Sequence, residues 1–272
     1  MATIGIFDSG VGGLSVLREI VRMLPEEKYV YFSDNAYCPY GEKSQDLILD
    51  RAREIVGYLL YKGADIIVVA CNTATAAAIA QLREMYSEPC DEVRMLTRGR
   101  RDHIKFIGME PAVKPAALGT RTGVIGVLAT DGTLHGSKYL NTKGQWEDEA
   151  RIVEHVGQGF VELVESGDIT GPHAEEVVGA SLRPLLDEGA DTIVLGCTHY
   201  PFLKDTIAKI AGPDIRIIDP APAVARQLVK VMDEDCIPHK KDIGSPCGTP
   251  DVILKASGSD EALKRTFSLI YL

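Results

Sequence analysis

The chain has 272 residues, of which 45% are hydrophobic, 25% charged and 6% aromatic, and its formal net charge is -10. Such a composition is that of an ordinary globular protein with a mostly aliphatic core, and the length allows two domains of modest size. The negative charge repels phosphate backbones and anionic lipids, so we expect neither a nucleic acid nor a membrane as a partner. A small anionic substrate remains compatible with it, because local amides and hydroxyls can outweigh the field of the whole chain.

The N-terminal residues and the cysteines favour a cytoplasmic protein. The stretch MATIGIFDSGVGG has no basic flank and no apolar signal region, and no apolar run in the sequence reaches spanning length. The six cysteines follow no regular spacing, which argues against a disulfide framework and for reduced thiols. Cys236, His239 and Cys247 are zinc-ligand types, but they lack a regular spacing and an evident fourth ligand, so we expect no metal.

Short apolar runs rich in β-branched residues alternate with longer helix-like segments along the chain. In the first third the sequence predicts strands over residues 3–8, 29–34 and 65–71, and helices from residue 13, over 45–61 and over 74–85. Later strands are predicted over residues 123–130, 151–156, 191–197 and 215–219, with helices near 137, from 159, and over 173–186, 202–210 and 222–232. Such alternation is typical of α/β domains with a parallel sheet.

One polar segment interrupts this alternation. Residues 87–105 include five basic side chains, which are Arg94, Arg98, Arg100, Arg101 and Lys105. A nucleic-acid patch has this kind of composition. However, the cluster is short, contains several acids and belongs to an acidic chain, so we predict a solvated surface insertion instead.

Two pairs of segments resemble each other. Residues 63–73 (GADIIVVACNT) and 189–199 (GADTIVLGCTH) share Gly-Ala-Asp, an apolar run and a cysteine in the same place. Two further segments, starting at Phe106 and Ile217, each pass from an apolar run through acid-Pro-Ala into a helix. The repetition predicts two pseudo-symmetric α/β domains, each with a mainly parallel sheet flanked by helices, and an active site in the cleft between them. We place the first domain at residues 1–108 plus 219–272 and the second at 109–218.

Cys71 and Cys197 follow the two repeated strands, at the ends where parallel sheets bind ligands. A single cysteine there would indicate a small buried hydrophobe, and Asn72, Thr73 or Thr198 could simply cap helices. Two cysteines in duplicated positions beside helix starts instead favour stabilised thiolates, next to amides that attract a carboxylate. One thiolate can remove a proton from carbon while the opposite thiol protonates the other face, and this inverts a stereocentre.

A third strand end lies at residues 4–13, IGIFDSGVGG, where glycines let the backbone approach a ligand closely. The stretch is no dinucleotide or P-loop motif, because Ser15 replaces the further glycine and no Gly-Lys follows, so NAD, FAD and ATP are not expected. Asp8 is either a helix cap or a carboxylate that assists proton transfer or accepts the substrate ammonium. His199 is either structural or a proton partner of Cys197.

Eight short motifs occur in order along nearly the whole chain. They are DSGVGGL (8–14), PYG (39–41), CNTA (71–74), LATDGT (128–133), FVELVE (160–165), LGCTHYP (195–201), DPAPA (219–223) and SG (257–258). In this combination the sequence resembles the aspartate/glutamate racemase family, and within it the glutamate racemases.

The resemblance implies an isomerase that interconverts L- and D-glutamate without a cofactor in the bacterial cytoplasm. It further implies that the product D-glutamate serves peptidoglycan synthesis, cell wall biogenesis and cell shape. Cys71 and Cys197 would be the acid/base thiols, assisted by Asp8 on one side and by Glu165 and His199 on the other. The implied substrate contacts are Asp8, Ser9, Tyr40, Gly41, Asn72, Thr73, Thr130, Thr133, Thr198 and His199. The expected partners are the small-molecule substrate and, at most, a second copy of the chain in a homodimer.

The sequence departs from the family pattern before the helix that carries Glu165. Gln158 and Gly159 stand where the family usually has Cys-Pro. Taken by itself, Glu165 has the pattern of a solvated helix residue, since Glu154 and Glu162 are close by. Its catalytic role therefore comes from the resemblance alone.

The residue types fit the chemistry that the resemblance implies. The α-proton of glutamate is very weakly acidic, and the adjacent carboxylate destabilises the developing carbanion, so amide and hydroxyl donors are needed in a water-poor cleft. Ser9, Asn72, Thr73 and Thr198 are such donors, and no lysine in the motifs could hold pyridoxal phosphate. One alternative is an aspartate or related amino-acid racemase, which only the side-chain pocket distinguishes. Another is a non-catalytic amino-acid-binding protein, which would need no paired thiols and would be expected to carry a secretion signal.

Overall fold

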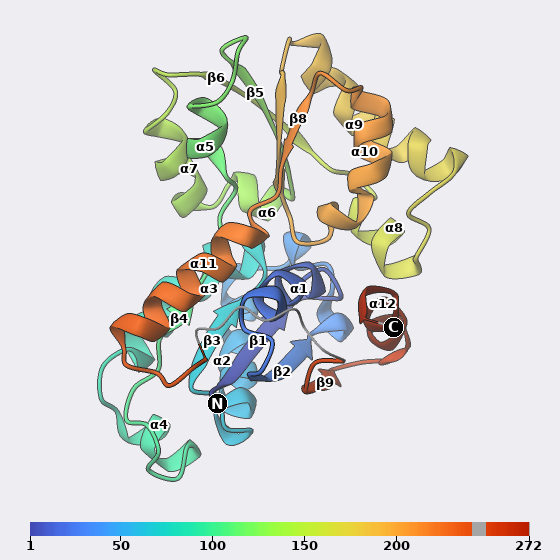
Figure 1. The fold of residues 1–272 in the computed structure, drawn as a ribbon. Coiled ribbons are helices and arrows are strands. Elements are labelled where there is room, and N and C mark those ends of the chain that lie inside the picture. The colour runs from blue at the N-terminus through green and yellow to red at the C-terminus, as the bar shows by residue number, and fades with distance from the viewer. Residues whose placement is uncertain (241–248, 272) are drawn as a thin grey trace. The chain divides into compact units, whose positions relative to one another are not determined.

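The computed structural model describes residues 1–240 and 249–271, and the chain divides into two compact units. Unit 1 consists of Met1–Met109 and Ala221–Leu272, and unit 2 of Glu110–Pro220. Each unit has a parallel β-sheet covered by helices, so the predicted α/β fold class is confirmed (Figure 1). Within the described ranges no helix is long and apolar enough to cross a lipid bilayer.

Unit 1 has a five-stranded parallel sheet in the order β4-β3-β1-β2-β9. Its strands are β1 (Thr3–Asp8), β2 (Lys28–Ser33), β3 (Ile66–Val69), β4 (Phe106–Ile107) and β9 (Val252–Ala256). Its helices are α1 (Leu14–Met23), α2 (Gln45–Tyr61), α3 (Asn72–Tyr86), α4 (Asp91–Leu96), α11 (Ala221–Glu234) and α12 (Glu261–Tyr271), with 3-10 turns η1 (Asn35–Tyr37) and η2 (Tyr40–Glu42). Helices α2 and α3 cover one face of the sheet, and α1 and α11 pack together on the other (Figure 1).

Unit 2 has a four-stranded parallel sheet in the order β6-β5-β7-β8. Its strands are β5 (Val124–Ala129), β6 (Arg151–Val156), β7 (Thr192–Gly196) and β8 (Arg216–Ile218). Its helices are α5 (Val113–Ala117), α6 (Asp131–Leu134), α7 (Ser137–Gly144), α8 (Phe160–Ser166), α9 (Pro172–Asp187) and α10 (Lys204–Ala211), with the 3-10 turn η3 (Tyr200–Leu203).

The two sheets share the order of their first four strands. Unit 1 runs β4-β3-β1-β2, and unit 2 runs β8-β7-β5-β6, so each of these four strands of unit 1 has a counterpart in unit 2, and β9 is additional. In both, the first strand pairs with the second and the third, and all pairs are parallel. The internal similarity of the sequence thus corresponds to a repeated topology, in which β3 and β7 are equivalent.

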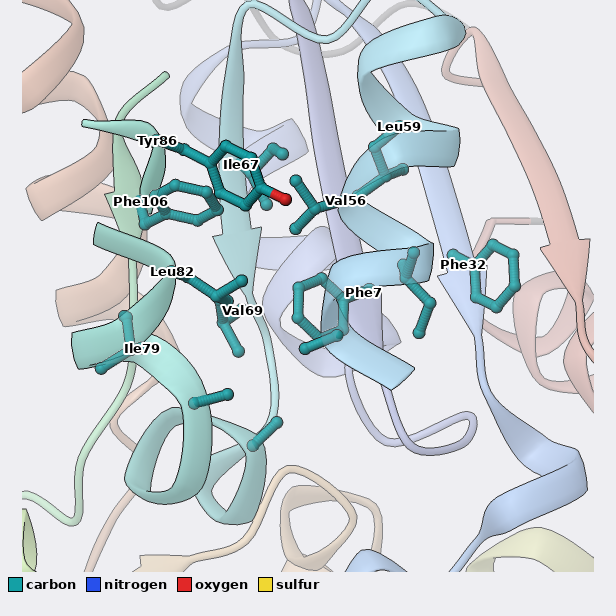
Figure 2. Close-up of a cluster of buried hydrophobic side chains, with 14 of the residues drawn as sticks. Phe7, Phe32, Val56, Leu59, Ile67, Val69, Ile79, Leu82, Tyr86 and Phe106 are labelled. Atoms are coloured by element: carbon teal, nitrogen blue, oxygen red, sulfur yellow. The ribbon is translucent and has the colours of Figure 1, made fainter. Parts of the chain in front are cut away.

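The core of unit 1 lies between the sheet and helices α2 and α3. Phe7, Ile67 and Val69 point from the strands toward Val56 and Leu82 on the helices, as Figure 2 shows. Alternate residues of a strand face opposite sides, which is why a run buried on both faces is continuously apolar. Each such side chain stabilises the fold by about 1.5–3 kcal/mol when it is fully buried. This packing fixes the ends of β1 and β3, from which the site residues extend.

The segment 87–105 is less solvated than the sequence predicted. It forms α4 and a following turn, and Val93 and Ile104 are buried in the core of unit 1. Among its basic side chains, Arg100 and Arg101 each lie 3.4 Å from the carboxylate of Asp65. The two apolar side chains anchor the segment, because burying them removes apolar surface from water.

Candidate active site

Cys71 stands between strand β3 and helix α3. The strand ends at Val69 and the helix begins at Asn72, so Cys71 takes the N-cap position with an extended backbone (φ -144°, ψ 122°). Its sulfur accepts a hydrogen bond from the amide of Ala74 at 3.4 Å. Because free amides and the helix dipole at an N-terminus favour negative charge, this environment suits a thiolate. The side chain is only 4% exposed.

Asp8 is connected to Cys71 through Ser9. The Asp8 carboxylate is fully buried and accepts hydrogen bonds from the amides of Ser9 at 2.7 Å and Gly13 at 2.6 Å. The Ser9 hydroxyl donates to Asp8 Oδ1 at 3.4 Å, and the Cys71 thiol donates to that hydroxyl at 3.8 Å. Asp8 therefore shapes the turn before α1 and lies one hydroxyl away from the thiol, so its position suits both roles that the sequence left open.

Asn72 presents a buried amide with unsatisfied hydrogen-bonding groups. The side chain is 4% exposed, and within residues 1–240 and 249–271 neither its oxygen nor its nitrogen has a hydrogen-bond partner. An unpaired buried polar group costs about 1–3 kcal/mol, so a buried amide of this kind is well suited to binding a polar group. Thr73 is buried beside it at the start of α3. Asn72 therefore offers a buried amide that can both donate and accept a hydrogen bond, and Thr73 follows it in the chain.

Tyr40 lies in turn η2 and belongs to the same buried cluster as Cys71. Its hydroxyl donates a hydrogen bond of 2.6 Å to Asp34 Oδ2. Burial raises the pKa of Tyr40 far above its usual value, and the hydrogen bond and charge of Asp34 and the charge of Cys71 raise it further. The phenol therefore remains protonated, and Gly41 follows it in a partly exposed position.

Cys197 directly follows strand β7 in unit 2. Its side chain is 7% exposed, and Gly196 before it pairs with Ala129 on β5, so Cys197 and Thr130 come from neighbouring strand ends. The helix predicted from residue 202 does not start there, because the 3-10 turn η3 comes first and α10 begins at Lys204. Unlike Cys71, Cys197 therefore caps no α-helix, and its polar partner is the side chain of His199.

His199 links the thiol of Cys197 to the carboxylate of Glu165. Its Nδ1 lies 3.7 Å from Cys197 Sγ, and its Nε2 lies 2.7 Å from Glu165 Oε1. Burial lowers the pKa of His199, but hydrogen bonds to Cys197 and Glu165 together with their charges outweigh it, so the pKa stands well above its usual value. The two partners therefore favour the protonated form of the ring. Glu165, on α8, is thus not a solvated side chain but the charged partner of a buried histidine.

The remaining predicted residues of unit 2 are hydroxyls near the strand ends. Thr130 and Thr133 share a hydrogen bond of 2.9 Å, and Thr133 and Thr198 are almost completely buried. The Thr130 backbone begins helix α6, since its carbonyl accepts from the amides of Thr133 and Leu134. These hydroxyls face the same end of the sheet as Cys197 because their strands are parallel neighbours.

Two structural contacts of this site were missed from the sequence. The Tyr200 ring packs against Phe160 with ring centres 4.9 Å apart, and its hydroxyl donates to the Gly157 carbonyl at 3.4 Å. A Cβ atom at Gly157 would lie 2.5 Å from that hydroxyl, so only glycine fits there. The only sequence signal was the position of Tyr200 beside Cys197 in the motif LGCTHYP. Through these contacts Tyr200 fixes the segment that carries Cys197 and His199.

The weaker zinc alternative involves residues outside this site. Cys236 is exposed, and the His239 ring lies 3.0 Å from the Ile237 carbonyl through Nδ1 and 3.7 Å from Asp233 through Nε2. Cys247 lies outside the described residues. The sequence expectation of no metal and no cofactor therefore stays a prediction.

Comparison with known proteins places the chain in a family. The family model described as "Asp/Glu/Hydantoin racemase" matches residues 4–228 of the chain. The chain belongs to the Asp/Glu/hydantoin racemase family. It is 41% identical over 271 residues to a glutamate racemase of Pseudomonas entomophila, covering 100% of this chain and 94% of that protein. It is 46% identical over 231 residues to a glutamate racemase of Pseudomonas putida, covering 85% of this chain and 82% of that one.

Two solved structures of the family are similar in fold. The Escherichia coli glutamate racemase in complex with L-glutamate and the activator UDP-MurNAc-Ala has a TM-score of 0.80 at 30% identity, covering 100% of this chain and 96% of that chain. The Francisella tularensis glutamate racemase in complex with D-glutamate has a TM-score of 0.75 at 26% identity, covering 99% and 93%. The resemblance noted in the eight motifs is thereby confirmed over the full chain.

Proposed function

We propose that this protein interconverts L- and D-glutamate by a two-thiol acid/base mechanism without a cofactor. The observation that carries the proposal is the repeated placement of a buried thiol at the equivalent ends of β3 and β7, in two units with the same strand order. A pair of equivalent thiols suits a reaction whose forward and reverse directions are chemically alike. The complexes of two relatives with L-glutamate and with D-glutamate support glutamate as the substrate.

In the proposed reaction one thiolate removes the α-proton of glutamate, and the other thiol donates a proton to the opposite face of the same carbon. The first sulfur ends protonated and the second ends as a thiolate, so atoms and charge balance. Return of either enantiomer uses the same two groups with their roles exchanged. The mechanism requires both thiols to reach a single α-carbon, and it needs neither an oxidant nor a carbonyl cofactor.

The residues around Cys71 have the chemistry for half of this reaction. The N-terminus of α3 stabilises a thiolate at Cys71, and the Ser9 hydroxyl lies between that sulfur and the Asp8 carboxylate. We assign the unsatisfied amide of Asn72, with Thr73, Tyr40 and Gly41, to binding the polar groups of the substrate. Hydrogen bonds from such donors lower the energy of the carbanion most where its charge develops on the carboxylate.

The residues around Cys197 provide the other half by different means. The imidazolium of His199 lies beside the sulfur and stabilises its negative charge, and Glu165 keeps the ring protonated and oriented. Thr130, Thr133 and Thr198 are assigned to substrate contacts in this unit. A charged partner here and a neutral serine beside Cys71 make the two thiols chemically distinct.

The proposed cellular role is supply of D-glutamate for peptidoglycan synthesis in the cytoplasm. The cysteines have no regular spacing, which fits reduced thiols in the cytoplasm. The net charge of -10 fits a small amino-acid substrate better than a nucleic acid. The five free cysteines of the described part include both proposed catalytic thiols. A homodimer is part of the proposal and is checked by measuring the mass in solution.

The deciding experiment is incubation of the protein with L-glutamate and with D-glutamate in D₂O, without added cofactor. Circular dichroism follows inversion, and NMR follows deuterium at the α-carbon. We expect both enantiomers to converge on an equal mixture with deuterium incorporated, because each protonation draws on a thiol that exchanges with solvent.

The same experiment separates the alternatives. L-aspartate run in parallel would have to invert faster than glutamate for an aspartate racemase. Glutamate that binds, as seen by calorimetry, but neither inverts nor exchanges its α-proton would indicate a binding protein. Either result would overturn the proposed function.

A further inference from the structure

Asp34 is a fully buried carboxylate just beyond the end of strand β2. Arg51, on helix α2, donates to both of its oxygens, from Nη2 to Oδ1 at 2.9 Å and from Nε to Oδ2 at 3.0 Å. A bidentate hydrogen bond of this kind fixes the orientation of the carboxylate as well as its distance from the guanidinium. The Arg51 side chain is only 14% exposed, so the pair is shielded from water.

The same ion pair holds the loop at residues 35–42, which carries Tyr40 and Gly41. Asp34 Oδ2 accepts the Tyr40 hydroxyl at 2.6 Å as well as the Arg51 guanidinium. The guanidinium also lies 4.3 Å from the centre of the Tyr37 ring. One arginine therefore contacts a residue of turn η1 directly and a residue of turn η2 through Asp34.

The loop is attached on its other side to the returning tail of unit 1. The Asn35 side chain accepts from the Gly258 amide at 2.8 Å, and the Ala36 amide donates to Ser257 Oγ at 3.1 Å. A Cβ at Gly258 would lie 3.1 Å from the Asn35 oxygen, so a larger residue there would press on the Asn35 side chain. These contacts hold residues 35 and 36 at the start of the loop, whereas Tyr40 is held by its hydrogen bond to Asp34.

The loop is also tied to the strand end that carries Asp8. The Asp34 amide donates to the Asp8 carbonyl at 2.9 Å. Tyr40 belongs to the buried cluster that contains Cys71, and the charge of Cys71 affects its ionisation. A shift of Asp34 would therefore move Tyr40 relative to the proposed catalytic thiol.

We propose that Arg51 is a positioning residue, which through Asp34 holds Tyr40 and Gly41 where they bind the substrate. The inference rests on the proposed function, since it assigns a role in glutamate binding. The contacts found for Arg51 are with Asp34, Tyr37 and Glu54. Because it acts on binding groups and not on the thiols, its loss is expected to change KM more than kcat.

The test compares Arg51→Met with Arg53→Met by steady-state kinetics on L-glutamate and D-glutamate. Arg53 lies two residues further along the same helix and is exposed, so its change removes the same charge without touching Asp34. We expect Arg51→Met to lose up to about 100-fold in kcat/KM, mostly through a higher KM, as misplaced binding groups do. Arg53→Met is expected to keep both constants within about twofold of wild type, as surface substitutions usually do.

A merely structural role gives a different result. Partial unfolding reduces the amount of active protein, so it lowers the apparent kcat and leaves KM unchanged, and that result would overturn the inference. If Arg51→Met does not fold, two variants decide the question. Arg51→Lys keeps the positive charge but loses the bidentate hydrogen bond. The double variant Asp34→Asn/Arg51→Met removes both charges of the pair. Each is expected to fold with a raised KM, and an unchanged KM in both contradicts the positioning role.

The outcomes also separate this inference from the function on which it rests. Wild-type protein that fails to invert glutamate refutes the proposed function and this inference with it. Wild-type protein that inverts glutamate, together with a folded Arg51→Met variant of unchanged KM, refutes the inference alone.

Discussion

Each proposed catalytic thiol is joined to a carboxylate through one intervening polar side chain. Cys71 reaches Asp8 through the hydroxyl of Ser9, and Cys197 reaches Glu165 through the ring of His199. The hydroxyl is neutral at all relevant pH values, whereas the ring carries a titratable charge. The two thiol–carboxylate connections therefore have the same order of groups, but only the one through His199 has an intervening group whose charge changes with pH.

Replacing either thiol is expected to remove most of the racemisation. Cys71→Ser and Cys197→Ser should each reduce kcat by about 100- to 10,000-fold, because a hydroxyl is a far weaker acid and general acid–base groups contribute this much. Polarimetry or circular dichroism on both enantiomers measures the loss. Cys236→Ser changes an exposed thiol outside the site and should be fully active. Wild-type activity in either site variant would refute the two-thiol mechanism.

The stability that His199 provides should depend on pH in a defined direction. Its pKa in the folded protein is raised above the usual value, so the protonated ring stabilises the fold. That contribution is fully present below the unfolded pKa of about 6.5 and is lost as the pH rises through the higher folded value. Urea unfolding of wild type and His199→Gln should therefore give the largest difference in unfolding free energy below pH 6.5 and a smaller one in alkali. A difference that grows with pH would contradict this assignment.

At the scale of elements, the strand and helix pattern was readable because burial imposes it. The runs at residues 3–8 and 123–130 became β1 and β5, since continuous apolar residues bury both faces of a parallel strand. Strand β9 and helix α12 were not predicted. In β9, Ile253 is 47% exposed and only Ala256 is buried, so its sequence VILKA carries a weak signal, as edge strands do.

The site was predictable only where chemistry-bearing residues lie next to each other in the sequence. The cysteine motifs and the DSG turn are local, so their strand ends could be located. The Asp34–Arg51 pair is 17 residues apart in sequence, and the His199–Glu165 pair is 34 apart. Such pairs depend on how α2 packs against β1 and how α8 packs against η3 and α9, and no periodicity in the chain encodes a single long-range contact.

The turn between β1 and α1 requires glycine at residue 13. A Cβ there would lie 2.8 Å from Asp8 Cβ and from the Tyr31 hydroxyl, so Gly13→Ala must shift the turn relative to both Asp8 and Tyr31. We expect a loss of about 1–3 kcal/mol in unfolding free energy, as for other overpacked sites. Activity should also fall, because Asp8 moves. Thermal and urea unfolding together with kinetics measure both effects.

Gly57, inside helix α2, provides the matched control for that substitution. Within the described part of the chain, no atom outside its own helix lies within 4 Å of a Cβ built there. Gly57→Ala should therefore raise the unfolding free energy by about 0.5–1 kcal/mol, since alanine loses less backbone entropy in a helix. If both alanine variants changed the unfolding free energy in the same direction, the close approach at Gly13 would not be the cause of the loss of stability.

At the scale of the whole molecule, the two units differ in how the chain builds them. Unit 2 is the single stretch Glu110–Pro220, and its core cluster joins α5, β5, α7 and β7 from within that stretch. Unit 1 needs two stretches, because β9 pairs with β2 and α11 packs on α1. The units are therefore unequal as separate folding domains.

A fragment of residues 110–220 should fold by itself, whereas one of residues 1–109 should not. The first retains a complete four-stranded sheet, and its length is within the usual range of independent domains. The second loses β9, α11 and α12, which leaves the apolar face of α1 uncovered. Urea unfolding followed by circular dichroism should give a cooperative transition for the first fragment alone. A cooperative transition for residues 1–109 would show that the returning tail is dispensable.

The insertion of one unit into the other also sets an order of events during synthesis on the ribosome. Domains usually fold from the N-terminus onward as they are made. Here every residue of unit 2 is translated before β9 and α12 of unit 1 exist. Unit 2, which contains Cys197, can therefore fold first. Unit 1, which contains Cys71, remains incomplete until β9 is synthesised. Until then the edge of its sheet at β2 is unpaired and accessible to chaperones or to incorrect strand pairing.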